Sequence, residues 1–230
     1  MKNQKIIDCT LFLNELELLE LRLESLYPHV DLFLIVESTK TFTGISKPLH
    51  YHNNKDRFKK WSDKIRYYVI DDMPLSANRE ELVKSTPIES QQTIEFFRET
   101  HQRNSIGKGL KSLNISYDDI IIVSDMDEFP NYNRFKNLNI NLPYGPVIFK
   151  QKWLVWNTQL EKTYPWMGST AFYYSHYIHD KYIFQKIRDD RWNTENPRFY
   201  IEDNGGFHFS SFGSLEFIRT KLKSFSHIVT

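Results

Sequence analysis

Runs dominated by apolar residues alternate along the chain with stretches in which apolar residues recur at helical spacing. The apolar runs predict strands and lie at residues 5–13, 31–37, 65–70 and 120–124. The run at 31–37 has no polar alternation inside it, which is typical of a strand buried on both faces. Asn14 is expected to cap a leucine-rich helix after the first run, with Glu17 completing a capping box. This alternation predicts an α/β fold with a central, mostly parallel sheet flanked by helices.

The remaining segments are less regular. Residues 75–87 are polar and are predicted to be irregular, whereas residues 89–113 carry one long helical pattern. In the second half we expect strands at 147–156 and 171–174, a strand pair at 198–201 and 207–210, and a closing helix at 215–225. No repeat or low-complexity linker divides the sequence, so a single domain over residues 1–230 is expected.

Composition narrows the classes of protein that fit. The chain has 30 basic and 29 acidic residues, so no basic surplus points to a nucleic acid partner. Cys9 is the only cysteine, which excludes an intramolecular disulfide. No apolar stretch has the length of a membrane span or of a signal-peptide core, so we expect a cytoplasmic protein without a membrane span.

Asp125 and Asp127 follow the apolar strand 120–124 directly. Ligands of open α/β sheets bind outside the carboxyl ends of the strands, so this position favours a binding site. Two carboxylates that lose solvent there need a compensating cation. Their hard oxygen atoms suit Mn²⁺ or Mg²⁺ bound together with substrate phosphates. The alternative is a solvated acidic turn that caps a helix near Asn131.

Other polar residues are candidates on weaker grounds. Glu37 ends one predicted strand and Asp72 follows another, so both could reach the same crevice, where Glu37 could bind a base or ribose. A plain ion pair is the alternative for each. Three arginines could hold a diphosphate bidentately or could form surface ion pairs: Arg57, Arg103 and Arg188. His208 lies between two phenylalanines after Gly205-Gly206, a setting more typical of a core histidine than of a ligand.

Several motifs of other enzyme classes are absent from the sequence. It contains no G-x-x-x-x-G-K-[ST] loop, no G-x-G-x-x-G after the first strand and no G-x-S-x-G elbow. It also lacks a Cys/His cluster of the zinc type. Kinase, dinucleotide dehydrogenase, serine hydrolase and zinc-enzyme functions therefore lack support.

Several segments in order along the chain resemble glycosyltransferase family 17, whose members are β-1,4-mannosyl-glycoprotein β-1,4-N-acetylglucosaminyltransferases. The resembling segments are residues 8–15, 36–44, 71–74, 102–104, 122–128 and 206–213. Each segment is modest alone, but their common order over nearly the whole chain makes the resemblance specific.

The resemblance implies a GT-A type fold, with a nucleotide-binding half at about residues 1–130 and an acceptor-side half at about 131–230. It implies a UDP-sugar donor, expected to be UDP-GlcNAc, a glycan or other hydroxyl acceptor, a divalent metal and inversion at the anomeric carbon. It assigns Asp125 and Asp127 to the metal and diphosphate, suggests Glu37 near the nucleotide, and makes His208 the candidate third metal ligand.

Inversion needs a carboxylate base that accepts the proton of the acceptor hydroxyl. Asp203 is the first candidate, followed by Glu128 and Glu202. One alternative function is a sugar-1-phosphate nucleotidyltransferase, but this would need a basic loop after the first strand, where the chain has the acidic sequence Asn14-Glu15-Leu16-Glu17. The second alternative function is non-catalytic binding of a sugar-nucleotide or carbohydrate.

Overall fold

The computed structural model describes residues 4–86, 89–142, 145–180, 183–193, 195 and 197–224. Its strands are β1 (Ile6–Phe12), β2 (Leu32–Ser38), β3 (Ile65–Ile70), β4 (Ile120–Asp125), β5 (Glu128–Pro130), β6 (Val147–Val155), β7 (Trp166–Tyr173), β8 (Tyr200–Glu202) and β9 (Gly206–Ser210). Its α-helices are α1 (Leu16–Leu26), α2 (His50–Asn53), α3 (Arg79–Ser85), α4 (Ile94–Asn104), α5 (Ile106–Lys111), α6 (Leu138–Asn141), α7 (Tyr174–His179), α8 (Ile183–Asp190) and α9 (Leu215–Ser224). Within these ranges, no helix has the length and apolarity needed to cross a membrane.

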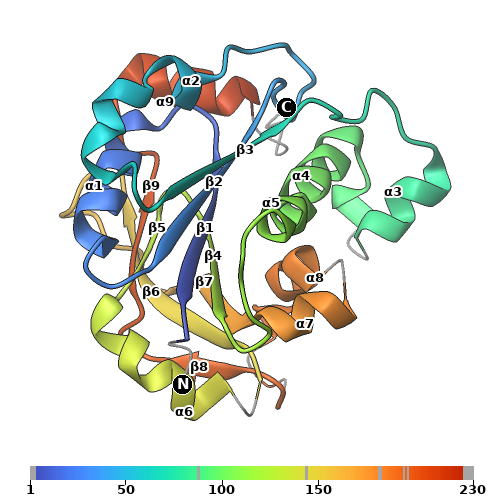
Figure 1. Cartoon of the computed structure of the whole chain (residues 1–230). Helices are drawn as coiled ribbons and strands as arrows, with labels where there is room; N and C mark the ends of the chain where they lie inside the picture. The colour runs from blue at the N-terminus through green and yellow to red at the C-terminus, as the bar shows by residue number, and fades with distance from the viewer. Residues whose placement is uncertain are drawn as a thin grey trace.

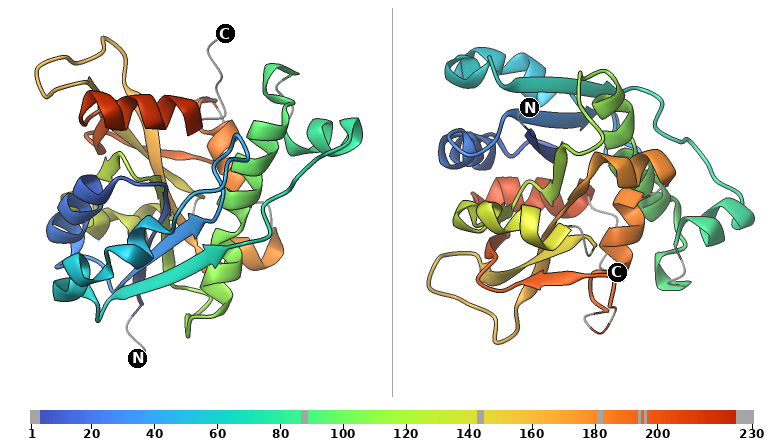
Figure 2. Two further views of the ribbon diagram at one scale, coloured as in Figure 1. Left: turned by 90° about the horizontal axis from the view of Figure 1, so that it is seen from above. Right: turned by 60° about the horizontal axis from the view of Figure 1, so that its bottom comes forward.

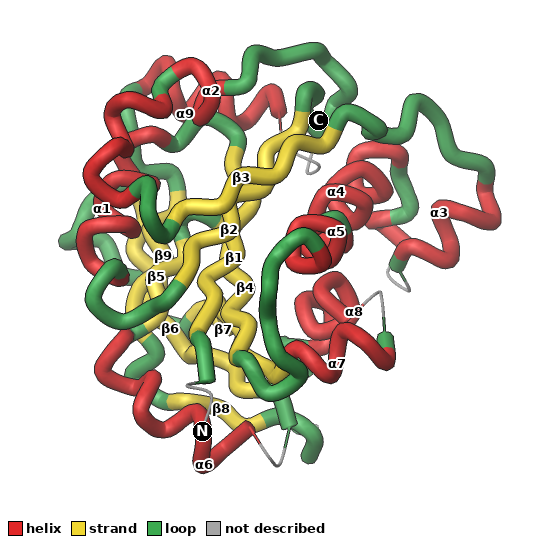
Figure 3. The backbone as a smooth tube through the Cα atoms, in the orientation of Figure 1, coloured by secondary structure: helices red, strands yellow, loops and turns green. Residues whose placement is uncertain are grey.

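One mixed sheet of nine strands runs through the described part of the chain, with the order β3-β2-β1-β4-β7-β6-β9-β5 and β8 beside β6 (Figure 3). The first four strands of this order are mutually parallel. Antiparallel pairing begins where β7 joins β4. The predicted α/β fold, with a mostly parallel central sheet flanked by helices, is therefore confirmed.

Helices cover both faces of the sheet, with α1 on one side and α4, α5, α7 and α8 on the other (Figure 1). The strand β2 shows why its apolar run is continuous. Phe33 and Ile35 pack into the core under α1, whereas Leu34 and Val36 pack into the core under α5. Both sets of side chains are buried, so each face of this strand contributes to folding through the hydrophobic effect.

Three local predictions were wrong. Helix α1 begins after Glu15, whose carboxylate accepts hydrogen bonds from the amides of Leu13 and Asn14, and no side chain caps the helix. The segment 75–87 contains helix α3, which has a capping box between Asn78 and Glu81 and stands out from the body of the molecule (Figure 2). Strands β8 and β9 pair with β6 and not with each other.

The predicted helix over residues 89–113 is divided. A 3-10 turn at Glu89–Gln91 precedes α4 and α5, and Ser105 separates the two helices. Helices α7 and α8 were not predicted, because each is short, although Phe184 and Ile187 form a buried apolar face on α8.

The order of the strands places a crevice between β1 and β4. The chain leaves β1 toward β2 on one side, whereas β4 is added on the other side. The connections after these two strands therefore diverge, which is the topological switch point where α/β sheets bind ligands.

Candidate functional site

A cavity of about 250 Å³ opens at this switch point. Leu11 and Asp125 are neighbours across the β1–β4 pair, and both line the cavity. The wall near β1 combines apolar side chains (Leu11, Phe12, Leu13 and Phe42) with polar and charged ones (Glu15, Lys40, Thr41 and Lys47). The wall near β4 is highly charged and includes Arg103, Asp125, Asp127, Arg188, His208 and Lys221.

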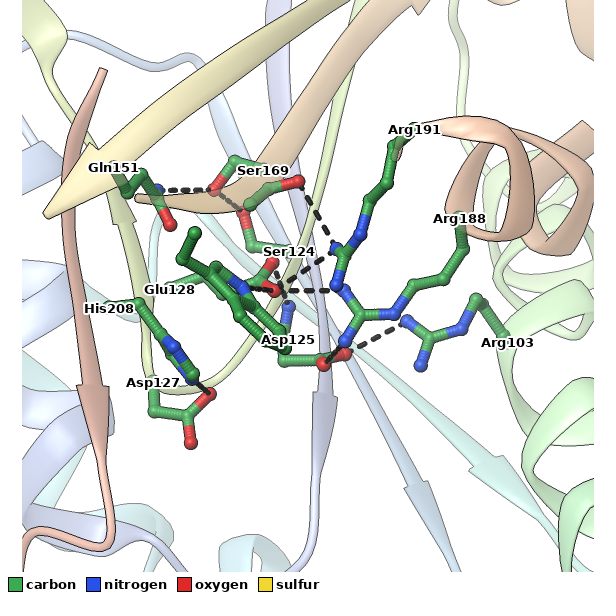
Figure 4. A network of polar contacts seen from close by, with 12 residues as sticks. Arg103, Ser124, Asp125, Asp127, Glu128, Gln151, Ser169, Arg188, Arg191 and His208 are labelled. Carbon is green, nitrogen blue, oxygen red and sulfur yellow. Dashed lines mark hydrogen bonds and ion pairs between the residues drawn. The ribbon is translucent and has the colours of Figure 1, made fainter. Parts of the chain in front are cut away.

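Asp127 and His208 come together through backbone pairing. The antiparallel β5–β9 pair sets His208 opposite Glu128, and the amide of Phe209 donates to the carbonyl of Asp127 at 2.8 Å. As a result Nε2 of His208 lies 3.5 Å from Oδ1 of Asp127 (Figure 4). Both side chains are largely buried, and Nδ1 of His208 is buried without a hydrogen-bond partner among the described residues.

The second carboxylate oxygen of Asp127 contacts the C-terminal helix. Nζ of Lys221, on α9, donates to Oδ2 of Asp127 at 2.7 Å. Burial by itself raises the pKa of Asp127, but Lys221 and His208 outweigh it and hold the pKa of this carboxyl well below its usual range. Asp127 is therefore an anion that a cationic partner already stabilises.

Asp125 is held by two arginines from different helices. Nη1 of Arg103, on α4, donates to Oδ1 at 2.8 Å, and Nη2 of Arg188, on α8, contacts Oδ2 (Figure 4). Burial raises the pKa of Asp125, but Arg103 and Arg188 outweigh burial and hold that pKa well below its usual range. Arg103 also forms an ion pair with Glu99 at 2.8 Å, one turn earlier on the same helix.

Glu128 organises the inner wall of the site although it is fully buried. Its Oε2 accepts the amide of Asp125, which closes the turn between β4 and β5. Its Oε1 accepts Nε1 of Trp166 at 2.7 Å and Nη1 of Arg188 at 2.8 Å, and it lies 3.2 Å from Nη1 of Arg191. Burial raises the pKa of Glu128, but Arg188 and Arg191 lower it overall.

Charges in this part of the structure are matched. Among the described residues, three carboxylates and three arginines form one connected network of ion pairs: Glu99, Asp125 and Glu128 with Arg103, Arg188 and Arg191. Asp127 forms a separate ion pair with Lys221 beside this network. A dianionic ligand alone or a divalent cation alone would disturb this balance, whereas the two together would preserve it.

The structure brings five of the predicted site residues to the cavity: Arg103, Asp125, Asp127, Arg188 and His208. Glu128 lies directly behind them. The other two predicted base candidates lie elsewhere. Asp203 is 78% exposed and forms a surface ion pair with Lys150 at 2.9 Å. Glu202 is buried at 6% exposure and lies 3.4 Å from the Nε of Arg134. Neither lines the cavity.

The remaining predicted donor-binding residues have other partners. Both carboxylate oxygens of Glu37 are engaged, since Oε1 accepts Lys47 Nζ at 2.7 Å and Oε2 accepts Tyr67 Oη at 2.7 Å. Asp72 forms ion pairs with His101 and Lys108. Arg57 pairs with Glu17 and Glu20 on α1. Glu37, Asp72 and Arg57 therefore form ion pairs, which was the alternative to a role in donor binding. None of the three lines the cavity.

Three residues of the site were not predicted: Lys221, Arg191 and Glu99. Their positions depend on how α8, α9 and α4 pack around the strand ends, and no strand-end position marks them in the sequence. In the structure Lys221 is only 8% exposed, and a lysine buried to this degree needs an acidic partner, but the sequence does not distinguish it from the neighbouring Arg219 and Lys223.

The side-chain oxygen of Asp127 and the ring nitrogen of His208 are suitable ligands for a divalent cation whose remaining ligands would come from substrate. One carboxylate oxygen and one imidazole nitrogen converge within 3.5 Å, and the imidazole makes no other hydrogen bond among the described residues. In the described ranges, no group of three or more His, Cys, Asp or Glu side chains is arranged to hold a metal ion, so substrate oxygens would have to supply the remaining ligands. An open site of this kind is typical of Mg²⁺ or Mn²⁺ bound through one or two carboxylates and phosphate oxygens.

Comparison with known proteins gave one family. Residues 1–229 match glycosyltransferase family 17. No curated protein matches the sequence. Among solved structures, the apo form of mouse xyloside xylosyltransferase 1 is similar in fold, with 10% sequence identity, a TM-score of 0.44 and coverage of 87% of this chain and 85% of that chain.

Proposed function

Because the chain belongs to glycosyltransferase family 17, we propose that it transfers GlcNAc from UDP-GlcNAc to a hydroxyl group of a glycan or similar acceptor. The proposal includes inversion at the anomeric carbon, dependence on Mn²⁺ or Mg²⁺ and a cytoplasmic location. The observation that carries it is the convergence of Asp127 and His208 at the switch-point cavity, beside the positive charges of Arg103 and Arg188.

The two ends of the cavity suit the two ends of a nucleotide-sugar. Near β1, the side chains of Leu11, Leu13 and Phe42 offer apolar surface for a nucleobase. Near β4, the partly exposed Arg188 could bind phosphate oxygens. Arg103 is buried with its guanidinium nitrogens bound to Asp125, Glu99 and Gln185, so it would contribute positive charge without a direct phosphate contact. The sugar would then lie between the diphosphate and the indole of Trp166, which also lines the cavity.

Asp127 and His208 would hold the metal, with diphosphate oxygens completing its coordination. When bound, the metal supplies Lewis-acid stabilisation of the negative charge on the leaving diphosphate. The protein adds fixed positive charges to the same end. Arg103 and Arg188 are anchored by Asp125 and Glu128, so their guanidinium groups are oriented before the donor binds.

In the proposed reaction, the acceptor oxygen forms a bond to the anomeric carbon while the bond from that carbon to the diphosphate oxygen breaks. The hydroxyl proton passes to a carboxylate, and UDP leaves with the bonding electron pair. Asp203 and Glu202 are poorly placed for this role because they do not line the cavity. The carboxylates that do line it are Glu15, Glu99, Asp125 and Asp127.

A donor screen tests the proposal. UDP release is measured over a panel of UDP-sugars with Mn²⁺, with Mg²⁺ and with EDTA, first with water and then with glycan acceptors. We expect UDP-GlcNAc to give the highest rate and EDTA to abolish it. His208→Gln is expected to reduce the rate and to raise the Mn²⁺ concentration needed for half-maximal activity. Equal rates with EDTA and Mn²⁺ would reject metal dependence.

Thermal shift measurements separate the alternative functions, since a ligand bound by the native state alone raises the melting temperature. A larger shift with UDP and Mn²⁺ together than with either alone supports the transferase, in line with the charge balance of the cavity. A shift with UTP and a sugar 1-phosphate supports a nucleotidyltransferase. A shift with glycan, combined with no UDP release from any donor, supports a non-catalytic binding protein.

A further inference from the structure

A short hairpin at residues 39–47 forms part of the cavity wall near β1. An antiparallel bridge between Lys40 and Ser46 joins its two arms, and the amide of Thr41 donates to the carbonyl of Ile45 at 2.9 Å. Four of its residues line the cavity: Lys40, Thr41, Phe42 and Lys47. The position of this hairpin therefore determines the shape of the cavity at the end proposed for the nucleobase.

Arg98, on α4, holds the hairpin from outside the cavity. Its side chain is 8% exposed and does not line the cavity. Its guanidinium nitrogens donate to three backbone carbonyls: Nη1 to Phe42 at 3.0 Å, Nε to Pro74 at 2.8 Å and Nη2 to Leu75 at 3.1 Å. A single side chain thus joins α4, the hairpin and the segment that leads to α3.

The contact between Arg98 and the hairpin is close. Gly44 has a φ of +86°, a conformation that glycine adopts without strain, and a Cβ atom there would come within 3.0 Å of the guanidinium of Arg98. A buried guanidinium needs acceptors for its N–H groups, and the carbonyl of Phe42 is one of the three that it has here. A shift of the hairpin would break this hydrogen bond, so the contact favours one position of Phe42 in the cavity wall.

The other attachments of the hairpin lead to the same cavity. At its base, Nζ of Lys47 donates to the fully buried Glu37 at 2.7 Å. Near its turn, Oγ1 of Thr43 donates to the carbonyl of Lys223 on α9 at 3.2 Å. The hairpin therefore connects α4 with α9, the helix whose Lys221 binds Asp127.

Resting on the proposed function, we propose that Arg98 is a positioning residue for the donor: it holds Phe42 in the cavity wall and thereby sets the affinity for the nucleoside part of a UDP-sugar. A wall that is ordered before binding spares the ligand the cost of ordering the hairpin. Asp127 and His208 are placed by the β5–β9 pair instead. Removal of Arg98 should therefore affect donor binding much more than the rate of transfer.

Calorimetry of UDP binding to the full chain, with Mg²⁺ present, tests this role. Arg98→Met is expected to weaken UDP affinity about tenfold, because the hairpin must then be ordered by the ligand. Arg98→Lys should lose less, since an ammonium group keeps the charge and can bind one of the carbonyls but lacks the planar fork. With the sugar donor, Arg98→Met should raise KM and leave kcat within about twofold.

A double-mutant cycle shows whether Arg98 acts through Phe42. Phe42→Ala should weaken UDP affinity by about as much as Arg98→Met. Addition of Arg98→Met to Phe42→Ala should cause little further loss, because both changes remove the same part of the wall. Additive losses would mean that Arg98 acts on UDP by another route and would overturn the proposal.

Hydrogen exchange provides a measurement that does not depend on any ligand. Exchange of the amides of residues 39–47 should be faster in Arg98→Met than in the wild type, while exchange in β2 stays unchanged. Should Arg98→Met fail to fold, Gly44→Ala tests the same contact from the hairpin side and should also weaken UDP and speed this exchange.

Arg66→Met is the matched control. Arg66, on β3, also donates to backbone carbonyls, those of Asp63 and Ile65, but it is exposed and does not line the cavity. Its removal should change neither UDP affinity nor exchange of the hairpin.

Unchanged UDP affinity or unchanged hairpin exchange in folded Arg98→Met would overturn the proposal, as would a fall in kcat with KM unchanged. A wild type that binds no UDP rejects the proposed function and with it the role of Arg98 in donor binding. That case is distinct, because the exchange measurement still decides whether Arg98 holds the hairpin.

Discussion

Nζ of Lys221 lies 2.7 Å from Oδ2 of Asp127, although 94 positions separate the two residues in the sequence. This contact joins α9 to the turn that follows β4, so the last described helix closes one side of the cavity. It also places an ammonium group on the carboxylate that we propose as a metal ligand. Lysine and metal would then neutralise the same side chain.

Lys221→Met should destabilise the fold by about 3 kcal/mol, because the largely buried Asp127 loses its principal cationic partner. Mn²⁺ should restore part of that loss, since a divalent cation can replace the ammonium group. Urea unfolding with and without Mn²⁺ measures both effects, and the gain from Mn²⁺ should be larger in the variant than in the wild type.

Lys150→Met is the matched control for that experiment. Lys150 also forms an ion pair with an aspartate, Asp203, but both side chains are exposed. Its removal should change stability by less than about 0.5 kcal/mol and should leave the response to Mn²⁺ unchanged. An equal response to Mn²⁺ in the wild type and in Lys221→Met would contradict the sharing of Asp127 between lysine and metal.

Acid should destabilise the protein through Asp125 and Asp127. Both carboxyls have folded-state pKa values well below their usual range, so protons bind them more strongly in the unfolded chain. The two carboxylates therefore stabilise the folded protein fully above the pKa of about 4 that they have in the unfolded chain. This stabilisation is lost as the pH falls toward their pKa values in the folded protein. The free energy of unfolding should change little through these two carboxyls between pH 7 and pH 5. It should be markedly lower at pH 3.5.

The double variant Asp127→Asn with Lys221→Met provides the comparison for the acid experiment. It removes one of the titrating carboxyls together with its cation, so the decrease between pH 5 and pH 3.5 should be smaller than in the wild type. An identical decrease in both proteins would show that the acid sensitivity arises elsewhere.

The sequence was sufficient for the parts of the fold that depend on local pattern. The apolar runs of β1, β2 and β4 predicted buried strands, and the acids after β4 predicted a site, because strand ends in α/β sheets carry ligands. Helix α3 was missed although Asn78 and Glu81 form a capping box, since the polar composition of that segment concealed a short helix. The sequence therefore determined the central layer better than its periphery.

The predicted site was less complete, for a physical reason. His208 reaches Asp127 only because β9 pairs with β5 and β6, and this pairing follows from tertiary packing that no local pattern records. The same packing turns Asp203 outward, five residues before His208, onto the surface beside Lys150. Proximity in sequence to a site residue was therefore a poor guide to proximity in space.

Asp203→Asn should leave turnover within about twofold of the wild type, because its carboxylate is exposed and lies away from the cavity. Glu128→Gln should reduce turnover strongly, since the amide cannot accept hydrogen bonds from Trp166, Arg188 and the amide of Asp125 together. Steady-state UDP release measures both. A general base contributes about 100-fold or more, so a loss of that size in Asp203→Asn would reinstate Asp203 as the base.

A buried ion pair supports the turn between β4 and β5 from beneath. Arg22, on α1, is fully buried, and its Nε and Nη2 atoms donate to the two carboxylate oxygens of Asp8 at 2.7 Å and 2.6 Å. Its Nη1 donates to the backbone carbonyl of Glu128 at 2.5 Å. Arg22 thereby fixes the residue whose side chain orients Arg188 and Arg191.

Arg22→Met should cost about 3 to 5 kcal/mol of stability, because Asp8 is left buried and charged without its partner. Adding Asp8→Val should recover most of that loss, since two apolar side chains can replace a buried ion pair. Turnover of the double variant should nevertheless stay about tenfold or more below the wild type, because the Glu128 carbonyl has lost its donor and small displacements of reacting groups reduce rates strongly. Urea unfolding and UDP release, measured on the same samples, separate the two effects. Recovery of both stability and turnover in the double variant would show that Arg22 stabilises the fold without positioning the site.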